Sequence, residues 1–231
     1  MRSAERSRDD RAEGLTAKAR IRDGAIALLG RSGFAATTVR SIAAEVGVSP
    51  ALLLHHFGSK DGLRQACDDH VLAWYAEAVA EIAEDDSAGT VIGMLDRRPE
   101  MMPMAAYVRR ALVDGGPSAG RIFDAVVADT ESYLQRSVAA GHIRPTDDER
   151  GRALLMVVTS LGSQLLADHV APPGTPPDEV LASVSDRLML PGLELYTFGL
   201  FTGTDYLDAY RQYAQRTGSR AAPDAGQGQQ R

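Results

Sequence analysis

The chain has 231 residues, and its 25 Lys and Arg against 31 Asp and Glu give a formal net charge of −6. Hydrophobic residues make up 44% of the chain and charged residues 24%, a balance that excludes disorder throughout and is typical of a globular protein. The acidic total argues at first against a nucleic-acid partner. However, residues 1–64 hold 11 Lys and Arg against 7 Asp and Glu, a net charge of +4, whereas residues 65–231 carry −10. The basic N-terminal part is therefore suited to a polyanionic partner.

The composition also indicates in which cellular compartment the protein is expected. The longest uncharged stretch in the middle of the chain, residues 153–167, is shorter than the roughly 20 residues of a spanning helix, so we expect no membrane segment. The first fifteen residues mix four arginines with four acidic residues and precede no apolar segment, so we expect no secretory signal. The single cysteine, Cys67, excludes an intramolecular disulfide and a cysteine-built zinc site, and fits a reducing cytoplasm.

The pattern of the chain predicts an all-α fold, because Ala, Leu, Arg and Glu recur at helical spacing and only 6% of residues are aromatic. Residues 1–15 are predicted to be a flexible arm, with Thr16 capping the first helix. Thr38 and Ser49 are predicted to cap two short helices. The predicted helices of this part cover residues 16–32, 38–46, 49–57 and 60–84.

Proline and glycine punctuate the remainder of the chain, so we expect shorter helices between them. These are predicted near residues 90–97, 100–114, 118–140, 147–169, 178–201 and 206–216. From Gly218 onward the chain consists mostly of Gly, Gln, Ala, Ser, Pro and Arg, which predicts a disordered tail over residues 218–231.

Residues 38–57 meet the physical requirements of a helix-turn-helix, with two short amphipathic helices around a turn at Gly47. That general pattern is weak by itself, but three specific strings accompany it: FAATTVRSIA at 34–43, GVSP at 47–50 and HHFGSKDGL at 55–63. Together they closely resemble the DNA-binding head of the TetR-like transcriptional regulators, over roughly residues 16–75. The string ELYTFGLF at 194–201 also resembles the last part of many ligand-binding domains of that family.

The resemblance implies a three-helix DNA-binding domain over residues 16–62, joined by a long helix to a ligand-binding and dimerisation domain over 63–217. The family contacts phosphates at the start of the second helix and reads bases from the outward side of the third, although capping and solvated charge remain an alternative for the phosphate positions. Leu54 stands where the family commonly has a tyrosine that donates to a phosphate. The DNA-binding residues implied are Thr37, Thr38, Arg40, Ser49, Pro50, Ala51, Leu52, Leu54, His55, His56 and Lys60.

One feature of the third helix can be judged from geometry alone. Consecutive helical residues lie about 100° apart, so the three leucines at 52–54 cannot all face one small core. At least one of them is expected to be exposed or to meet DNA.

The implied partners are double-stranded DNA with a palindromic site, a second copy of the chain, and a largely apolar small-molecule effector. Dimerisation would use the predicted helices 147–169 and 178–201. The resemblance implies no cofactor and no enzymatic activity, and most often a repressor released by its ligand. Apolar and polar side chains suited to an effector pocket, which could equally be ordinary core residues, are Met102, Tyr107, Phe123, Met156, Gln164 and His169.

Other patterns favour plainer interpretations. Residues 116–120 match a serine-hydrolase elbow, but no strand precedes them, so Ser118 is expected to cap a helix. Neighbours His55 and His56 diverge too far to share a metal ion. Residues 68–70 are expected to form a solvated face rather than an acid cluster.

Two other functions remain alternatives. One is a helical small-molecule-binding protein or enzyme that uses the apolar pocket without specific DNA binding, which no nucleophilic or metal-binding pattern supports. The other is an activator or a DNA-organising protein of low sequence specificity.

Overall fold

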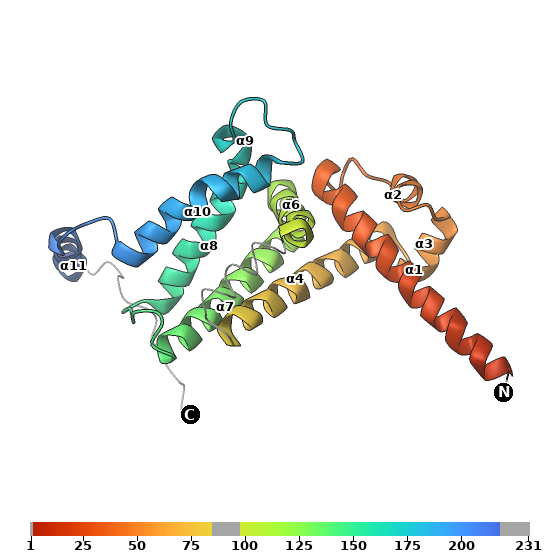
Figure 1. Cartoon of the computed structure of the whole chain (residues 1–231), viewed down its shortest axis with the longest axis horizontal. Helices are drawn as coiled ribbons and strands as arrows, with labels where there is room; N and C mark the ends of the chain where they lie inside the picture. Colours follow the sequence, from red (N-terminus) through yellow and green to blue (C-terminus); the bar gives the residue numbers. More distant parts are fainter. Residues whose placement is uncertain (1, 85–97, 218–231) are drawn as a thin grey trace. The chain divides into compact units, whose positions relative to one another are not determined.

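The computed structural model describes residues 2–84 and 98–217, and the side chains of residues 16–81 and 101–217. Every regular element in these ranges is an α-helix, which confirms the predicted all-α fold (Figure 1). The chain divides into two units, residues 1–82 with 87–126 and residues 83–86 with 127–231. Among the described residues, no helix combines the length and the apolar character needed to cross a membrane.

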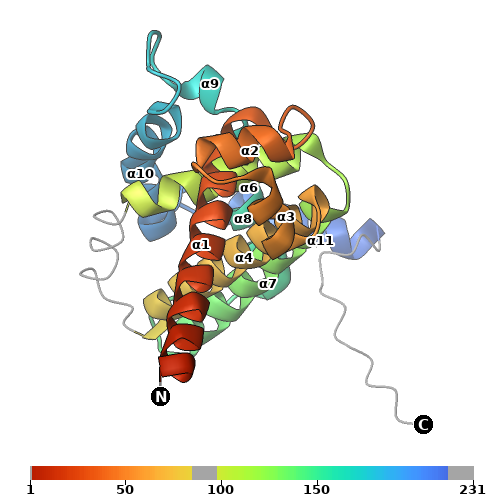
Figure 2. The ribbon, with the colours of Figure 1, turned by 90° about the vertical axis from the view of Figure 1, so that its right-hand side faces the viewer.

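The first unit contains the predicted helix-turn-helix. Its helices are α1 (Arg2–Ser32), α2 (Val39–Glu45), α3 (Pro50–Phe57), α4 (Lys60–Glu84) and α6 (Arg98–Asp114), followed by the start of α7 (Pro117–Ala139). In both views α2 and α3 lie beside the C-terminal half of α1, and α6 also packs along α1 (Figures 1 and 2). The helix α4 has the bounds predicted from the sequence.

The core of this unit is built from the apolar stripes that the spacing predicts. Burying an aliphatic side chain of this size stabilises the fold by about 1.5–3 kcal/mol, so these few contacts hold the head together. The apolar side chains from α1, α2, α3 and α4 that are at most 4% exposed are Ile21, Ala25, Ile26, Leu29, Ile42, Ala43, Leu53, Leu63, Cys67 and Val71.

The start of α1 differs from the prediction. The helix begins at Arg2 rather than after Thr16, so the helix start predicted at Thr16 is wrong. The flexibility predicted for residues 1–15 stays a prediction. Thr16 lies inside the helix and does not cap it. The physical reason is that the Arg, Ala and Glu of this segment are good helix formers, and nothing in it breaks the helix.

The second unit comprises the rest of α7 together with α8 (Glu149–Leu165), α9 (Ala167–Val170), α10 (Val180–Phe198) and α11 (Asp205–Thr217). Ala167, Val180 and Val184 form a buried cluster that joins α9 to α10, and α8 packs on α10 (Figure 1). The single helix predicted over 147–169 is wrong in one respect, because it breaks at Leu166. The helix predicted near 90–97 and the tail predicted over 218–231 lie outside the described residues.

Candidate nucleic-acid interface

The third helix of the head, α3, presents a largely apolar face to solvent. The Ser49 hydroxyl caps this helix by accepting the Leu52 N–H at 3.1 Å, and Pro50 occupies the first helical position. Leu53 is fully buried, whereas Leu52 and Leu54 are 36% and 41% exposed. The geometric expectation that the three leucines cannot share one core is therefore confirmed.

The second helix, α2, begins with a reciprocal cap. The Thr38 hydroxyl accepts the Ser41 N–H at 3.0 Å, and the Ser41 hydroxyl accepts the Thr38 N–H at 2.8 Å. This cap fixes the first turn of α2, on which Arg40 is exposed. Among the described residues Arg40 has no ion-pair partner, whereas Arg31 binds Glu45 at 2.6 Å and Arg22 binds Asp23 at 2.8 Å. Arg40 is thus a cation of the head that is free to meet a phosphate.

Three of the implied DNA-binding residues are directed elsewhere. Thr37 is only 3% exposed, and its hydroxyl donates to the Phe34 carbonyl at 3.1 Å. Lys60 donates to the same carbonyl at 2.5 Å and lies 4.0 Å from the centre of the Phe34 ring. His56 is half-buried, and its Nε2 has no hydrogen-bond partner among the described residues. The other eight implied DNA-binding residues are exposed at the start of α2 and on α3, and they are Thr38, Arg40, Ser49, Pro50, Ala51, Leu52, Leu54 and His55.

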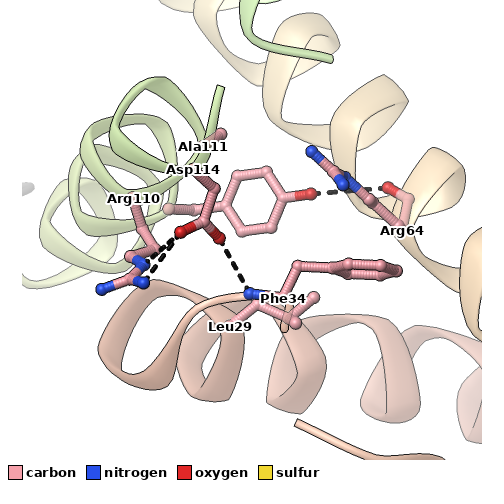
Figure 3. A pocket seen from close by; sticks show the side chains of 7 residues that line it. Leu29, Phe34, Arg64, Arg110, Ala111 and Asp114 are labelled. Carbon is pink, nitrogen blue, oxygen red and sulfur yellow. Dashed lines mark hydrogen bonds and ion pairs between the residues drawn. The ribbon is translucent and has the colours of Figure 1, made fainter. Parts of the chain in front are cut away.

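The turn between α1 and α2 is tied to α6 through Phe34, as Figure 3 shows. The Phe34 N–H donates to Asp114 Oδ2 at 2.9 Å, and the Arg110 guanidinium donates to Asp114 Oδ1 at 2.8 Å. Burial raises the pKa of Asp114, but the hydrogen bonds from Phe34 and Arg110 outweigh it and leave that pKa below its ordinary value. The carboxylate is therefore charged at neutral pH. Sequence reasoning missed this contact, because nothing local marks Asp114.

Two cations of α4 contact the Phe34 ring. The Arg64 guanidinium lies 4.5 Å from the ring centre, and the Lys60 ammonium lies 4.0 Å from it. Next to it, the Tyr107 hydroxyl oxygen lies 3.4 Å from the Arg64 carbonyl oxygen. These side chains line a cavity of about 10 Å³, which has room for a water molecule and not for an organic ligand. The residues that line it are Leu29, Phe34, Arg64, Tyr107, Arg110, Ala111 and Asp114.

A buried carboxylate joins α4 to α6 and α7. Asp68 is 1% exposed and accepts hydrogen bonds from Tyr107 at 2.7 Å, Ser118 at 2.8 Å and Arg121 at 2.8 Å. Burial and the hydrogen bond to Asp68 raise the pKa of Tyr107, so its phenol stays protonated and donates.

Two interpretations from the sequence are therefore corrected. The solvated face expected at residues 68–70 is wrong for Asp68, although Asp69 is exposed as expected. Ser118 is not a cap, because it lies in the first turn of α7 and donates to Asp68. The partners on α6 and α7 lie some 40 to 50 residues beyond Asp68, at separations that no local pattern reveals.

The six residues proposed for an effector pocket are distributed over both units. Met102, Tyr107 and Phe123 belong to the first unit, and Met156, Gln164 and His169 belong to the second. Tyr107 lines the small cavity beside Phe34, whereas His169 lines an open hollow of about 490 Å³ next to the proline-rich segment 172–177. The Gln164 Oε1 is buried without a hydrogen-bond partner among the described residues.

Two family profiles match the chain. The profile described as bacterial regulatory proteins of the tetR family matches residues 21–67, which include all of α2 and α3. The profile described as the C-terminal domain of tetracyclin repressor-like proteins matches residues 99–202, from α6 to the end of α10.

Individual relatives agree with these profiles. The structure of the transcriptional regulator FadR from Bacillus subtilis, in complex with stearoyl-CoA, has a TM-score of 0.58 at 15% identity and covers 79% of this chain and 98% of that one. A structure that concerns the control of antibiotic production by bacterial hormones also has a TM-score of 0.58, at 20% identity, covering 78% of this chain and 97% of that one. Both likenesses concern the fold.

Sequence identity extends over nearly the whole chain in one case. The HTH-type transcriptional regulatory protein RaaS of Mycobacterium tuberculosis, strain ATCC 25618 / H37Rv, is 35% identical over 206 residues, which are 89% of this chain and 97% of that protein. The match spans the capped α2 and α3 of the head as well as the helices that follow. The chain therefore belongs to the TetR family of DNA-binding helix-turn-helix transcriptional regulators, which are not enzymes.

Proposed function

We propose that the protein is a homodimeric repressor that binds a palindromic operator and releases it when a largely apolar effector binds. The observation that carries this proposal is that the chain has two different exposed surfaces. One is the exposed face of α2 and α3, which includes Arg40 and His55, and the other is an apolar face on α8 and α10.

The face of α3 suits the major groove of DNA. The methyl and isobutyl groups of Ala51 and Leu52 fit thymine methyl groups, and His55 can donate to a purine acceptor. Thr38 and Arg40, at the capped start of α2, would bind backbone phosphates and set the register. Leu54 offers no hydroxyl where the family commonly has tyrosine, so one phosphate contact worth about 1 kcal/mol is absent here.

The second surface suits a copy of the same chain. On α8, Leu155 is 67% exposed and Val158 is 50% exposed, and on α10, Leu190 is 66% exposed. Exposed aliphatic side chains on two adjacent helices favour a two-fold interface in which four helices pack together. A dimer of this kind would present two heads to successive major grooves, so its site would be a palindrome.

Release would follow from an effector that binds better to the DNA-free conformation. A 100-fold preference for that conformation supplies about 2.7 kcal/mol per site, enough to empty most of the operator at moderate protein concentration. FadR, which has a similar fold, has been solved with stearoyl-CoA, and the methionines of α6 would offer adaptable apolar side chains to an effector of similar apolar character.

The experiment that tests the proposal is selection of bound duplexes from a random DNA pool by the full-length protein. The expected result is enrichment of a palindrome whose half-sites lie about one helical turn apart. Binding to the recovered site should weaken steeply with salt, because several phosphates are neutralised. An unenriched pool would support a DNA-organising protein, and no retention of duplex at low salt would overturn DNA binding itself.

A further inference from the structure

The turn that leads into α2 is held from two sides. Phe34 is the second residue after α1 and lies four residues before the Thr38 cap. Its carbonyl accepts the Thr37 hydroxyl and the Lys60 ammonium, both of which belong to the head. Its N–H donates to Asp114, the last residue of α6. A helix outside the DNA-binding motif therefore binds the main chain of the turn directly.

The C-terminal end of α1 packs closely against α6. A Cβ at position 30 would lie 3.0 Å from the Tyr107 nitrogen, and a Cβ at position 33 would lie 2.4 Å from the Arg110 Nε. Glycine at both positions permits this approach. Because closely packed backbones shift together, a displacement of α6 reaches the end of α1 and the turn beyond it.

A second contact from α6 goes to α4. The Tyr107 hydroxyl donates to Asp68 at 2.7 Å, and the same oxygen lies 3.4 Å from the Arg64 carbonyl oxygen. Tyr107 and Asp114 are seven residues apart, which places them about 10 Å apart along α6. The helix α6 therefore contacts α4 at one point and the α1–α2 turn at another.

We propose that Asp114 is a positioning residue that couples α6 directly to the α1–α2 turn, so that α6 controls the placement of Thr38 and Arg40 without acting through α4. The inference rests on the proposed function, because it concerns how the proposed DNA-binding face is regulated. Coupling between sites is reciprocal, so DNA bound at the head must in turn alter α6. This reciprocity allows a test that needs no effector.

The test is amide hydrogen exchange of full-length wild type, Asp114→Ala and the matched control Asp124→Ala, an exposed carboxylate on α7. In the free protein, the amide of residue 34 should exchange about 10-fold to 100-fold faster in Asp114→Ala and at the wild-type rate in the control. Asp114→Asn keeps an acceptor oxygen and should give an intermediate rate. Unchanged exchange at residue 34 in Asp114→Ala, with circular dichroism showing a folded protein, overturns the contact.

The second arm adds a saturating concentration of the duplex recovered by selection. In wild type and in Asp124→Ala, amides of residues 108–114 should exchange more slowly when DNA is bound. In Asp114→Ala, residues 38–57 should still be protected while residues 108–114 no longer respond, a separation that a merely destabilised protein would not show. An equal response of residues 108–114 in Asp114→Ala overturns the coupling. If wild type binds no duplex, the proposed function fails instead, and the free-protein arm still decides the contact.

Discussion

The Asp68 carboxylate on α4 and the Arg121 guanidinium on α7 form an ion pair at 2.8 Å although 53 residues separate them in the chain. Asp68 is 1% exposed, and the Tyr107 and Ser118 hydroxyls also donate hydrogen bonds to it. A buried carboxylate is tolerated only with such partners, so this site fixes α4 against α6 and α7.

Replacing Asp68 by Asn should lower the free energy of unfolding by about 3 kcal/mol, because three donors lose their charged acceptor. The matched control is Asp69→Asn, since Asp69 also faces Arg121 but its side chain is 59% exposed. That change should cost less than about 0.5 kcal/mol. Urea unfolding followed by circular dichroism, at one fixed protein concentration, measures both. Equal losses in the two variants would contradict the assigned role of Asp68.

Replacing Gly33 by Ala should destabilise the fold more than replacing Gly115 by Ala. Both glycines have positive φ, +79° and +70°, so both variants carry the strain of a left-handed residue, about 1–2 kcal/mol. Only at position 33 would the new Cβ meet a side chain, displacing the Arg110 guanidinium from Asp114. In an Arg110→Ala background the difference between the two glycine variants should disappear. Thermal unfolding of the six proteins checks this, and a difference that persists would exclude the Arg110 contact as its cause.

The stability that Asp114 contributes should decrease as the pH falls. Its pKa is lower in the folded protein than the ordinary value of an aspartate, so the folded state binds this proton less readily than the unfolded chain does. The contribution is therefore full above about pH 4 and is lost as the pH falls through the folded value. The difference in unfolding free energy between wild type and Asp114→Asn should shrink from pH 6 to pH 2.5. A difference that grows on acidification would have the wrong sign.

Replacing Arg40 by Ala should weaken binding to the selected duplex and reduce its salt dependence. Each subunit would lose about one phosphate contact, so the slope of log affinity against log salt should fall in magnitude by about 1 per subunit. Arg31→Ala is the matched control, because Arg31 is already paired with Glu45. Fluorescence anisotropy at four salt concentrations measures the slopes. Identical slopes for wild type and Arg40→Ala would remove Arg40 from the interface.

Replacing Leu155 by Glu should convert the proposed dimer into monomers, because it would place a charge in the apolar contact between two copies of α8. Val113→Glu is the control, since Val113 is 60% exposed on α6 in the first unit. Light scattering after size exclusion should give about 25 kDa for Leu155→Glu and about twice that for wild type and for the control, from a chain of 24.7 kDa. A wild-type monomer would contradict the dimer.

Much of the head could be predicted because its determinants are local. Local residues determine the caps at Thr38 and Ser49, the bounds of α4, and the fact that Leu52, Leu53 and Leu54 cannot all be buried together. The side chains of Thr37 and Lys60 could not be placed from the motif, because both bind a main-chain carbonyl at Phe34.

The remaining differences arise from partners that lie far along the chain. The charge pattern of residues 68–70 predicts a solvated face, and only the fold brings Tyr107, Ser118 and Arg121 to Asp68. The break at Leu166 escapes the periodicity for a related reason, because Ala167 turns inward to pack on Val180 and Val184 of α10. Periodicity gives the face of a helix but not the helix that covers it.

The contact between Asp114 and Phe34 uses the amide of the turn and not its side chain. Any residue except proline offers the same N–H. The hydrogen bond therefore restricts which residue can stand at position 114, but at position 34 it excludes only proline. A head transplanted from another chain onto this body would keep the connection, provided that its turn has the same length and its second residue is not proline. Recombination of heads and sensor domains, in nature or in the laboratory, could then preserve communication between parts that had never evolved together.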